Sequence, residues 1–138
     1  MITIKKQEIV KLEDVLHLYQ AVGWTNYTHQ PEMLEQTLSH SLAIYVALDG
    51  DAVVGLIRLV GDGFSSVFVQ DLIVLPSYQR QGIGSSLMKD ALEDFKEAYQ
   101  VQLATEETEK NVGFYRSMGF ETLSTYDCTG MIWVNREK

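Results

Sequence analysis

Residues 71–85 read DLIVLPSYQRQGIGS, and no other run in the chain constrains its fold and chemistry as strongly. The apolar first part predicts a buried strand, Pro76 ends it, and Gly82 and Gly84 flank the first residue of a predicted helix. The glycines allow a backbone path that side chains would obstruct, so the amide groups of residues 81–85 can converge on an anion. The helix start adds unpaired donors and the positive end of its dipole. This run therefore predicts a phosphate-binding loop.

Two other nucleotide-binding loops do not fit this run. A Rossmann loop needs Gly or Ala where Leu87 stands, and a carboxylate about twenty residues further on. A P-loop needs Gly-Lys-Ser/Thr, but Ser85 follows Gly84 with no lysine between them. Arg80 supplies a positive charge beside the turn, although such residues are often only solvated. The remaining alternative is a glycine-containing turn that binds no ligand.

The residues before this run alternate between helical and strand patterns. We expect a first strand at Ile2–Lys5, a helix from Leu12 that stops at Gly23, and a short helix opened by Pro31. Turn residues at positions 49–51 and 61–63 then separate three strands. The two turns predict an antiparallel meander of three strands, Leu42–Leu48, Ala52–Val60 and Ser66–Leu75.

The residues after the loop predict a crossover and two further strands. The helical stripe continues to about Tyr99, and the next strand, Val101–Thr105, should lie parallel to the strand that precedes the loop. A short helix, Glu109–Met118, follows, with Thr108 as its cap and Gly119 at its end. A final hairpin is expected at Glu121–Tyr126 and Met131–Val134. The fold class is therefore α/β (α+β), one domain over residues 1–138, with a mixed sheet of about seven strands and helices on both faces.

Composition narrows the possible functions. The chain has 138 residues, 46% of them hydrophobic, and a net charge of −8, which argues against a nucleic-acid binder. The longest apolar run, Leu42–Leu48, is too short to span a membrane, and the first residues lack the order of a signal peptide, so we expect a cytoplasmic protein. A single cysteine, Cys128, excludes an internal disulfide, and no metal is expected because the three histidines form no recognisable ligand set: His17, His29 and His40.

Two motifs together resemble the GNAT acetyltransferase superfamily. That family carries Q/R-x-x-G-x-G/A between its fourth strand and third helix, which Gln79, Gly82 and Gly84 match. It also carries an aromatic-Tyr pair followed by Gly-Phe near the C-terminus, which residues 114–120, FYRSMGF, match. The resemblance implies an acetyl-CoA-dependent N-acyltransferase whose fourth and fifth strands are parallel and splayed. The pantetheine arm of CoA would lie between those strands, on the main chain of Leu72, Ile73 and Val74, and the pyrophosphate on the loop of Gln79, Arg80, Gln81, Gly82, Ile83, Gly84 and Ser85.

The same resemblance assigns the catalytic chemistry. A bulge in the fourth strand is expected to leave an amide free for the thioester oxygen. Tyr115 takes the position of the residue that protonates the departing thiolate, although a phenol (pKa ~10) is a weaker acid than a thiol (~8.5). Many relatives carry Asn where this chain has Thr108, and Asn111 is the candidate to replace that cofactor contact.

The acceptor is expected to be a primary amine on a small molecule or a protein. Trp24 and Tyr27 lie where the family forms one wall of the acceptor groove, and could equally anchor a loop. Asp71, Glu106 and Glu107 are carboxylates that could accept the amine's proton, but no spacing distinguishes them from solvated or ion-paired groups. A homodimer is expected from family habit. A transferase for a longer acyl group and a non-catalytic acyl-CoA sensor remain open.

Overall fold

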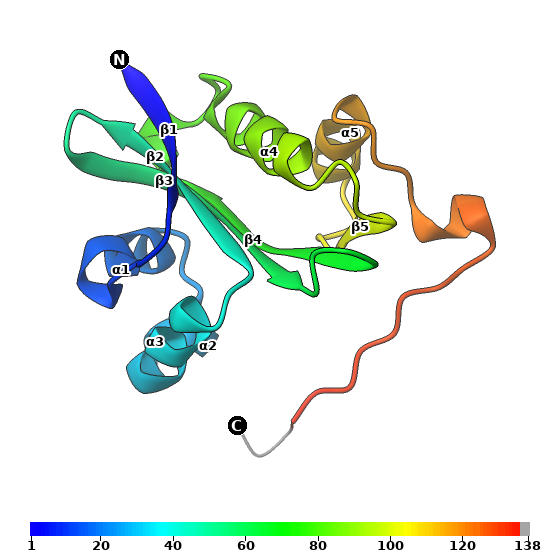
Figure 1. The fold of residues 1–138 in the computed structure, drawn as a ribbon, viewed down its shortest axis with the longest axis horizontal. Coiled ribbons are helices and arrows are strands. Elements are labelled where there is room, and N and C mark those ends of the chain that lie inside the picture. The colour runs from blue at the N-terminus through cyan, green and yellow to red at the C-terminus, as the bar shows by residue number, and fades with distance from the viewer. Residues whose placement is uncertain (136–138) are drawn as a thin grey trace. The chain divides into compact units, whose positions relative to one another are not determined.

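A five-stranded sheet organises the first of two compact units in the chain. The computed structural model describes residues 1–135. The boundary between the two units lies between Ala104 and Thr105. The strands of the first unit follow the order β1-β2-β3-β4-β5 (Figure 1), with bounds Ile2–Gln7, Ala43–Asp49, Ala52–Gly61, Ser66–Val74 and Gln100–Leu103. Neighbours pair antiparallel from β1 to β4, whereas β5 lies parallel to β4. The mixed sheet, the meander and the parallel crossover are confirmed. The prediction of about seven strands is wrong, because the sheet has five within the described residues.

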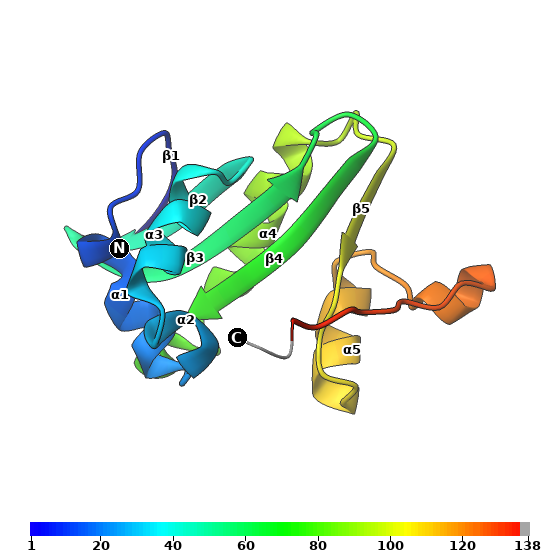
Figure 2. The ribbon, with the colours of Figure 1, turned by 90° about the horizontal axis from the view of Figure 1, so that it is seen from below.

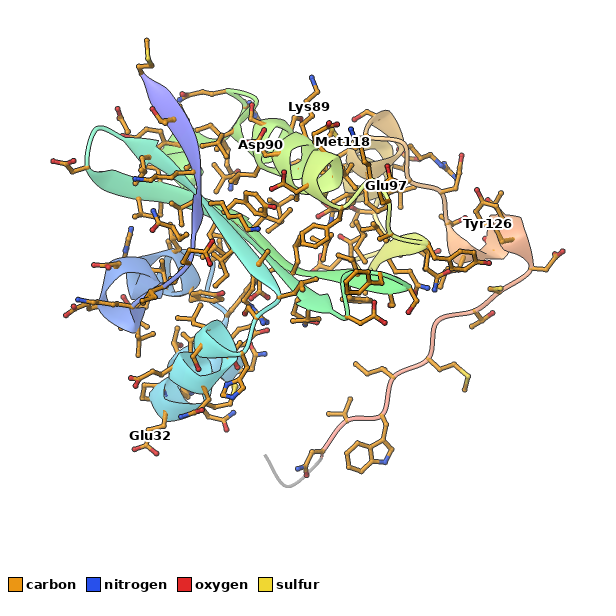
Figure 3. The ribbon with its side chains drawn as sticks, viewed as in Figure 1. Glu32, Lys89, Asp90, Glu97, Met118 and Tyr126 are labelled. Carbon is orange, nitrogen blue, oxygen red and sulfur yellow. The ribbon has the colours of Figure 1, made fainter. Side chains whose placement is uncertain are left out.

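Helices cover both faces of this sheet, as expected. One face carries three helices and the other carries α4 (Figure 1), with bounds α1 Leu12–Ala21, α2 Thr25–Thr28, α3 Pro31–Ser39 and α4 Ile83–Asp94. Glu32 on α3 and Lys89 on α4 point away from the sheet on its opposite sides (Figure 3). The helix α2 was not predicted, since four residues are too few to show a helical period.

Two apolar layers hold these helices to the sheet. Leu18 of α1, Leu34 of α3 and Leu56 of β3 are fully buried in the layer on the α1 face. Leu87 and Met88 of α4 are fully buried on the other side. Burial of each such side chain stabilises the fold by about 1.5–3 kcal/mol. Among the described residues, no helix is both long enough and apolar enough to cross a lipid bilayer.

The second unit begins at Thr105 and contains α5, Glu109–Ser117. Its cap is the predicted one, because the Thr108 hydroxyl accepts a hydrogen bond from the Asn111 amide at 3.1 Å. Gly119 follows with φ +99°, a conformation that favours glycine.

Both strands predicted after α5 are wrong. Residues 123–126 form a 3₁₀-helix, and residues 128–135 have no regular secondary structure. Thr122 explains the first difference: its carbonyl accepts from the Thr125 amide at 3.0 Å, and its hydroxyl contacts the Ser124 hydroxyl at 2.9 Å. These bonds turn the chain where an extended strand was expected. The segment 131–134 has no strand beside it within residues 1–135, so no ladder forms.

Candidate active site

A β-bulge in β4 fixes the orientation of the side chains around the candidate site. Arg58 of β3 lies opposite Asp71, whereas Leu59 lies opposite Val69, so Gln70 is the extra residue. Directly opposed residues point to the same face of a sheet. The bulge therefore turns Val69 toward α4 and Asp71 toward α1. The irregularity expected in this strand is present, at Gln70.

The C-terminal half of β4 presents an open backbone edge. β5 pairs only with residues 66–69 of β4 and then ends (Figure 2), so within the described residues no strand pairs with the rest of β4 on that side. The Leu75 amide donates to the Val54 carbonyl at 2.9 Å, so that residue faces β3. By strand alternation Ile73 also faces β3, and Leu72 and Val74 direct their N–H and C=O groups to the open edge. Of the three residues predicted for pantetheine, these two offer backbone groups.

The loop after β4 has an unusual backbone. Arg80 and Gly82 are both left-handed, at φ +68° and +77°. This conformation costs a non-glycine residue about 1–2 kcal/mol, and such strain is concentrated at functional sites. A Cβ atom at Gly82 would meet nothing within 4 Å, so the glycine serves the backbone conformation rather than close packing. The Gln79 side chain donates to the Val74 carbonyl at 3.1 Å and ties the loop to the open edge of β4.

The start of α4 supplies amide donors to the same loop. The first intrahelical bond runs from the Ser86 amide to the Gly82 carbonyl at 3.0 Å. The amides of Ile83, Gly84 and Ser85 therefore have no acceptor within the helix. Ile83 is buried and anchors the turn, whereas Arg80 beside it is exposed. Converging amides, a helix dipole and an exposed guanidinium suit a pyrophosphate.

A buried polar cluster lies on the α1 face, next to the bulge. Asp71 and Arg58 are 2% and 4% exposed, and their charged groups are 2.7 Å apart. The Tyr19 hydroxyl donates to Asp71 at 2.8 Å and the Tyr27 hydroxyl donates at 3.2 Å. Arg58 also donates to the Ser41 hydroxyl at 3.3 Å and the Tyr27 hydroxyl at 3.2 Å. The Asp71 carboxylate is thus held by three donors.

The tyrosines of this cluster are neutral donors. Burial, together with the charge of Asp71, raises the pKa of Tyr19 and of Tyr27. Burial alone would lower the pKa of Arg58, but the charge of Asp71 outweighs it and the pKa is raised. Sequence reasoning missed Arg58 as the partner of Asp71.

The three residues predicted to meet the acceptor lie together in the first unit. The ring centroids of Trp24 and Tyr27 are 6.2 Å apart, and Tyr27 bonds Asp71 directly. Both aromatic rings are half-buried against the core around α1. They therefore combine an anchoring role with an exposed remainder that could contact an acceptor.

Tyr115 lies in the second unit, on α5. Its ring centroid is 5.0 Å from that of Phe114 and 6.1 Å from that of Phe120. Burial raises the pKa of Tyr115, so the phenol keeps its proton at neutral pH. Asn111 is half-buried one helical turn before it, and its backbone amide is taken by the Thr108 cap.

The remaining polar candidates form no metal site. Within residues 1–135, no group of three or more His, Cys, Asp or Glu side chains is placed to hold a metal ion. The His17 ring nitrogen Nε2 lies 2.7 Å from the Val53 carbonyl, so that histidine bonds the backbone. Glu106 and Glu107 are exposed.

Comparisons with known proteins agree with this geometry. The family model described as Acetyltransferase (GNAT) domain matches residues 40–122. A solved GNAT-family acetyltransferase from Streptococcus pneumoniae is 90% identical, covers 99% of both chains and superposes with a TM-score of 0.91. The chain is 27% identical to an Arabidopsis thaliana GCN5-related chloroplastic N-acetyltransferase over 95% of its own length and 66% of that protein. An aminoglycoside N-acetyltransferase solved with CoA shares the fold, with a TM-score of 0.68 at 18% identity over 100% of this chain and 96% of that one.

Proposed function

Because the chain belongs to the GNAT acetyltransferase family, we propose that it transfers the acetyl group of acetyl-CoA to a primary amine. The observation that carries this proposal is the continuity of one run of residues, 71–85. It contains an open β4 edge, a strained loop and the free amides of a helix start. These features would bind the long, anionic CoA molecule along its length.

Different residues of the first unit would bind different parts of the cosubstrate. Leu72 and Val74 would bind the amides of the pantetheine arm through their main-chain groups, as a neighbouring strand would. Arg80, Gly84 and the other amides of the loop would hold the pyrophosphate. Gln79 fixes the loop against the Val74 carbonyl and so keeps the two subsites in register.

The bulge and Tyr115 supply the groups for the chemical step. We propose that an amide at the bulge stabilises the negative charge that develops on the thioester oxygen as the amine attacks. Tyr115 would then donate a hydrogen bond to the sulfur as the carbon–sulfur bond breaks. Its raised pKa makes complete proton transfer to a thiolate less favourable, so we propose stabilisation by the hydrogen bond.

The amine's own proton needs another acceptor. Asp71 already accepts from Arg58, Tyr19 and Tyr27, so it would act only through rearrangement of that cluster. We propose that the proton leaves through water to an exposed carboxylate, such as Glu106 or Glu107. The acceptor itself is an amine of a small molecule or protein, with Trp24 and Tyr27 as its aromatic contacts.

The domain and its location follow from the same proposal. The family match at residues 40–122 spans the boundary between the two units, so we propose that all 138 residues act as one acetyltransferase domain. We also propose that the reaction takes place in the cytoplasm, with acetyl-CoA as its cosubstrate.

Thermal melting tests the cosubstrate first. Acetyl-CoA at 100 times its Kd should stabilise the fold by about 2.7 kcal/mol, a rise in Tm of several degrees. NAD and ATP should raise Tm much less, because their loops are absent. If acetyl-CoA, NAD and ATP raised Tm equally, the assignment of acetyl-CoA as the cosubstrate would be wrong.

Turnover is tested separately by thiol release from acetyl-CoA. The panel comprises polyamines, aminoglycosides, amino acids and peptide N-termini, with longer acyl-CoA donors in parallel. Release with at least one amine supports the transferase. Binding of acetyl-CoA without release for any amine would favour the acyl-CoA sensor.

A further inference from the structure

A tyrosine–aspartate hydrogen bond joins the loop between β4 and α4 to a strand that is not its neighbour. Tyr78 ends the 3₁₀-helix Pro76–Tyr78, directly before the loop, and its hydroxyl donates to the Asp49 carboxylate at 2.6 Å. Asp49 is the last residue of β2, and β3 separates that strand from β4 in the sheet. The bond therefore reaches past a whole strand. Both residues are only partly exposed.

The partners of Asp49 show which contact its carboxylate favours. The hydrogen bond to Asp49 raises the pKa of Tyr78, so the phenol keeps its proton and remains a donor at neutral pH. The other carboxylate oxygen of Asp49 lies 3.8 Å from the exposed amino group of Met1. The tyrosine before the loop is thus the closer of these two partners, and hydrogen bonds to a charged group are stronger than those between neutral groups.

The loop that follows Tyr78 has a backbone that needs support. Arg80 and Gly82 are both left-handed and exposed. After them, Ile83 is buried against β3, since a Cβ atom at Gly55 would lie 3.4 Å from the Ile83 Cγ2 atom. The loop is therefore anchored after its exposed residues by Ile83 and before them by Tyr78. Without the first anchor, the loop would have more conformations to lose when it binds a ligand.

We propose that Tyr78 and Asp49 are positioning residues, which hold this loop in the conformation that binds the diphosphate of CoA. The inference rests on the proposed function, and neither side chain is expected to touch the cosubstrate. The Gln79 bond to the Val74 carbonyl restrains the same loop but is exposed, whereas the Tyr78 bond is partly buried and charge-assisted. A preformed loop binds more tightly because less conformational entropy is lost on binding.

The charge of Asp49 separates this role from a simple electrostatic effect. A carboxylate near the loop repels a bound diphosphate, so charge alone predicts that its removal tightens CoA binding. Asp49→Ala removes both the charge and the bond, and the proposal predicts that the Kd for CoA rises by about 5–10-fold. Asp49→Asn removes the charge but keeps an oxygen that accepts from Tyr78. Its Kd should stay within about twofold of the wild-type value.

Tyr78→Phe tests the other partner of the bond. It removes one hydroxyl, keeps the ring, and should raise the Kd for CoA by about 5–10-fold. Combined with Asp49→Ala it should bind no more weakly than either single variant, because both break the same bond. Tyr45→Phe is the matched control. The Tyr45 hydroxyl, also on β2, donates to Asp94 at the other end of α4 at 2.5 Å, so its loss should leave the Kd unchanged.

Calorimetry with CoA measures these constants, and circular dichroism checks that each variant is folded. An unchanged Kd in Tyr78→Phe, or a lower one in Asp49→Ala, would overturn the inference while leaving acetyl-CoA as the cosubstrate. An equal rise in Tyr45→Phe would also overturn it, because a lost tyrosine bond would then act through the stability of the whole fold. A wild-type protein that binds no CoA would overturn the proposed function, and this inference with it.

Discussion

The phenol of Tyr115 is the single group on which the proposed catalysis depends most directly. Tyr115→Phe removes one hydroxyl and keeps the ring that contacts Phe114 and Phe120. If the hydroxyl stabilises the leaving thiolate, its loss affects only the step in which the carbon–sulfur bond breaks. We expect kcat to fall by about 10–1000-fold with an almost unchanged Kd for CoA. Steady-state kinetics and calorimetry together measure both quantities.

Two results would separate this role from packing. The decrease in kcat caused by Tyr115→Phe should be smaller with an acyl donor whose thiol is a better leaving group, because less stabilisation of the thiolate is then needed. If the variant instead loses CoA binding and turnover together, Tyr115 packs against the cosubstrate and has no catalytic role.

The Arg58–Asp71 pair makes a prediction about stability. Arg58→Met leaves the buried Asp71 carboxylate without its counter-charge, which should lower the free energy of unfolding by about 3–5 kcal/mol. Arg58→Met combined with Asp71→Leu removes both charges, and its loss should be smaller than that of the single variant. Urea denaturation followed by circular dichroism measures both. The single variant Asp71→Leu completes the comparison: if the loss in the double variant equals the sum of the two single losses, the two side chains do not depend on each other.

At the scale of elements, the loop between β4 and α4 carries the cosubstrate prediction. Gly84→Asp places bulk and a negative charge at the helix start, where the pyrophosphate is proposed to bind. The Kd for CoA should rise by at least tenfold while the fold persists. Lys89→Asp is the control, because it adds an acid to the exposed side of the same helix, away from the sheet (Figure 3).

Calorimetry on the two folded variants decides this prediction. The control should bind CoA with nearly the wild-type Kd. An unchanged Kd in Gly84→Asp would mean that the pyrophosphate is bound elsewhere, whatever the family resemblance implies.

The elements that the sequence predicted well are those with a strong local signal. The helix that follows the glycine loop and the Thr108 cap depend on neighbouring residues, and both are confirmed. The predicted hairpin after α5 failed because a strand also needs a partner ladder, which local pattern does not reveal. The hydroxyl of Thr122 bonds within a turn that competes with the strand. That hydroxyl was the one signal in the sequence that favoured a turn here.

The buried ion pair was hidden for a different reason. Counting pairs outward from the turn, where Gly61 opposes Val67, would place Arg58 opposite Gln70. The bulge shifts the register by one residue and brings Asp71 opposite Arg58 instead. A sequence pattern does not locate such a shift. Sequence reasoning therefore named Asp71 alone, and its contact with Arg58 became visible only from the register.

The net charge of −8 is a property of the whole molecule, and it predicts how salt affects the reaction. An amine with a pKa near ~10.4 arrives as a cation, so the field of an acidic protein raises its encounter rate at low salt. Raising the ionic strength from about 0.02 to 0.3 M shortens the Debye length from roughly 20 Å to below 8 Å and screens that attraction. For a multiply charged amine, kcat/KM should therefore fall by about 3–10-fold.

An acceptor of similar size that is neutral overall should show little change, and it serves as the control. The measurement uses initial rates at saturating acetyl-CoA, so that salt effects on CoA binding do not contribute. If kcat/KM for the polycation is unchanged or rises with salt, the acidic surface plays no part in capturing the acceptor, and the charge serves only to keep the protein in solution.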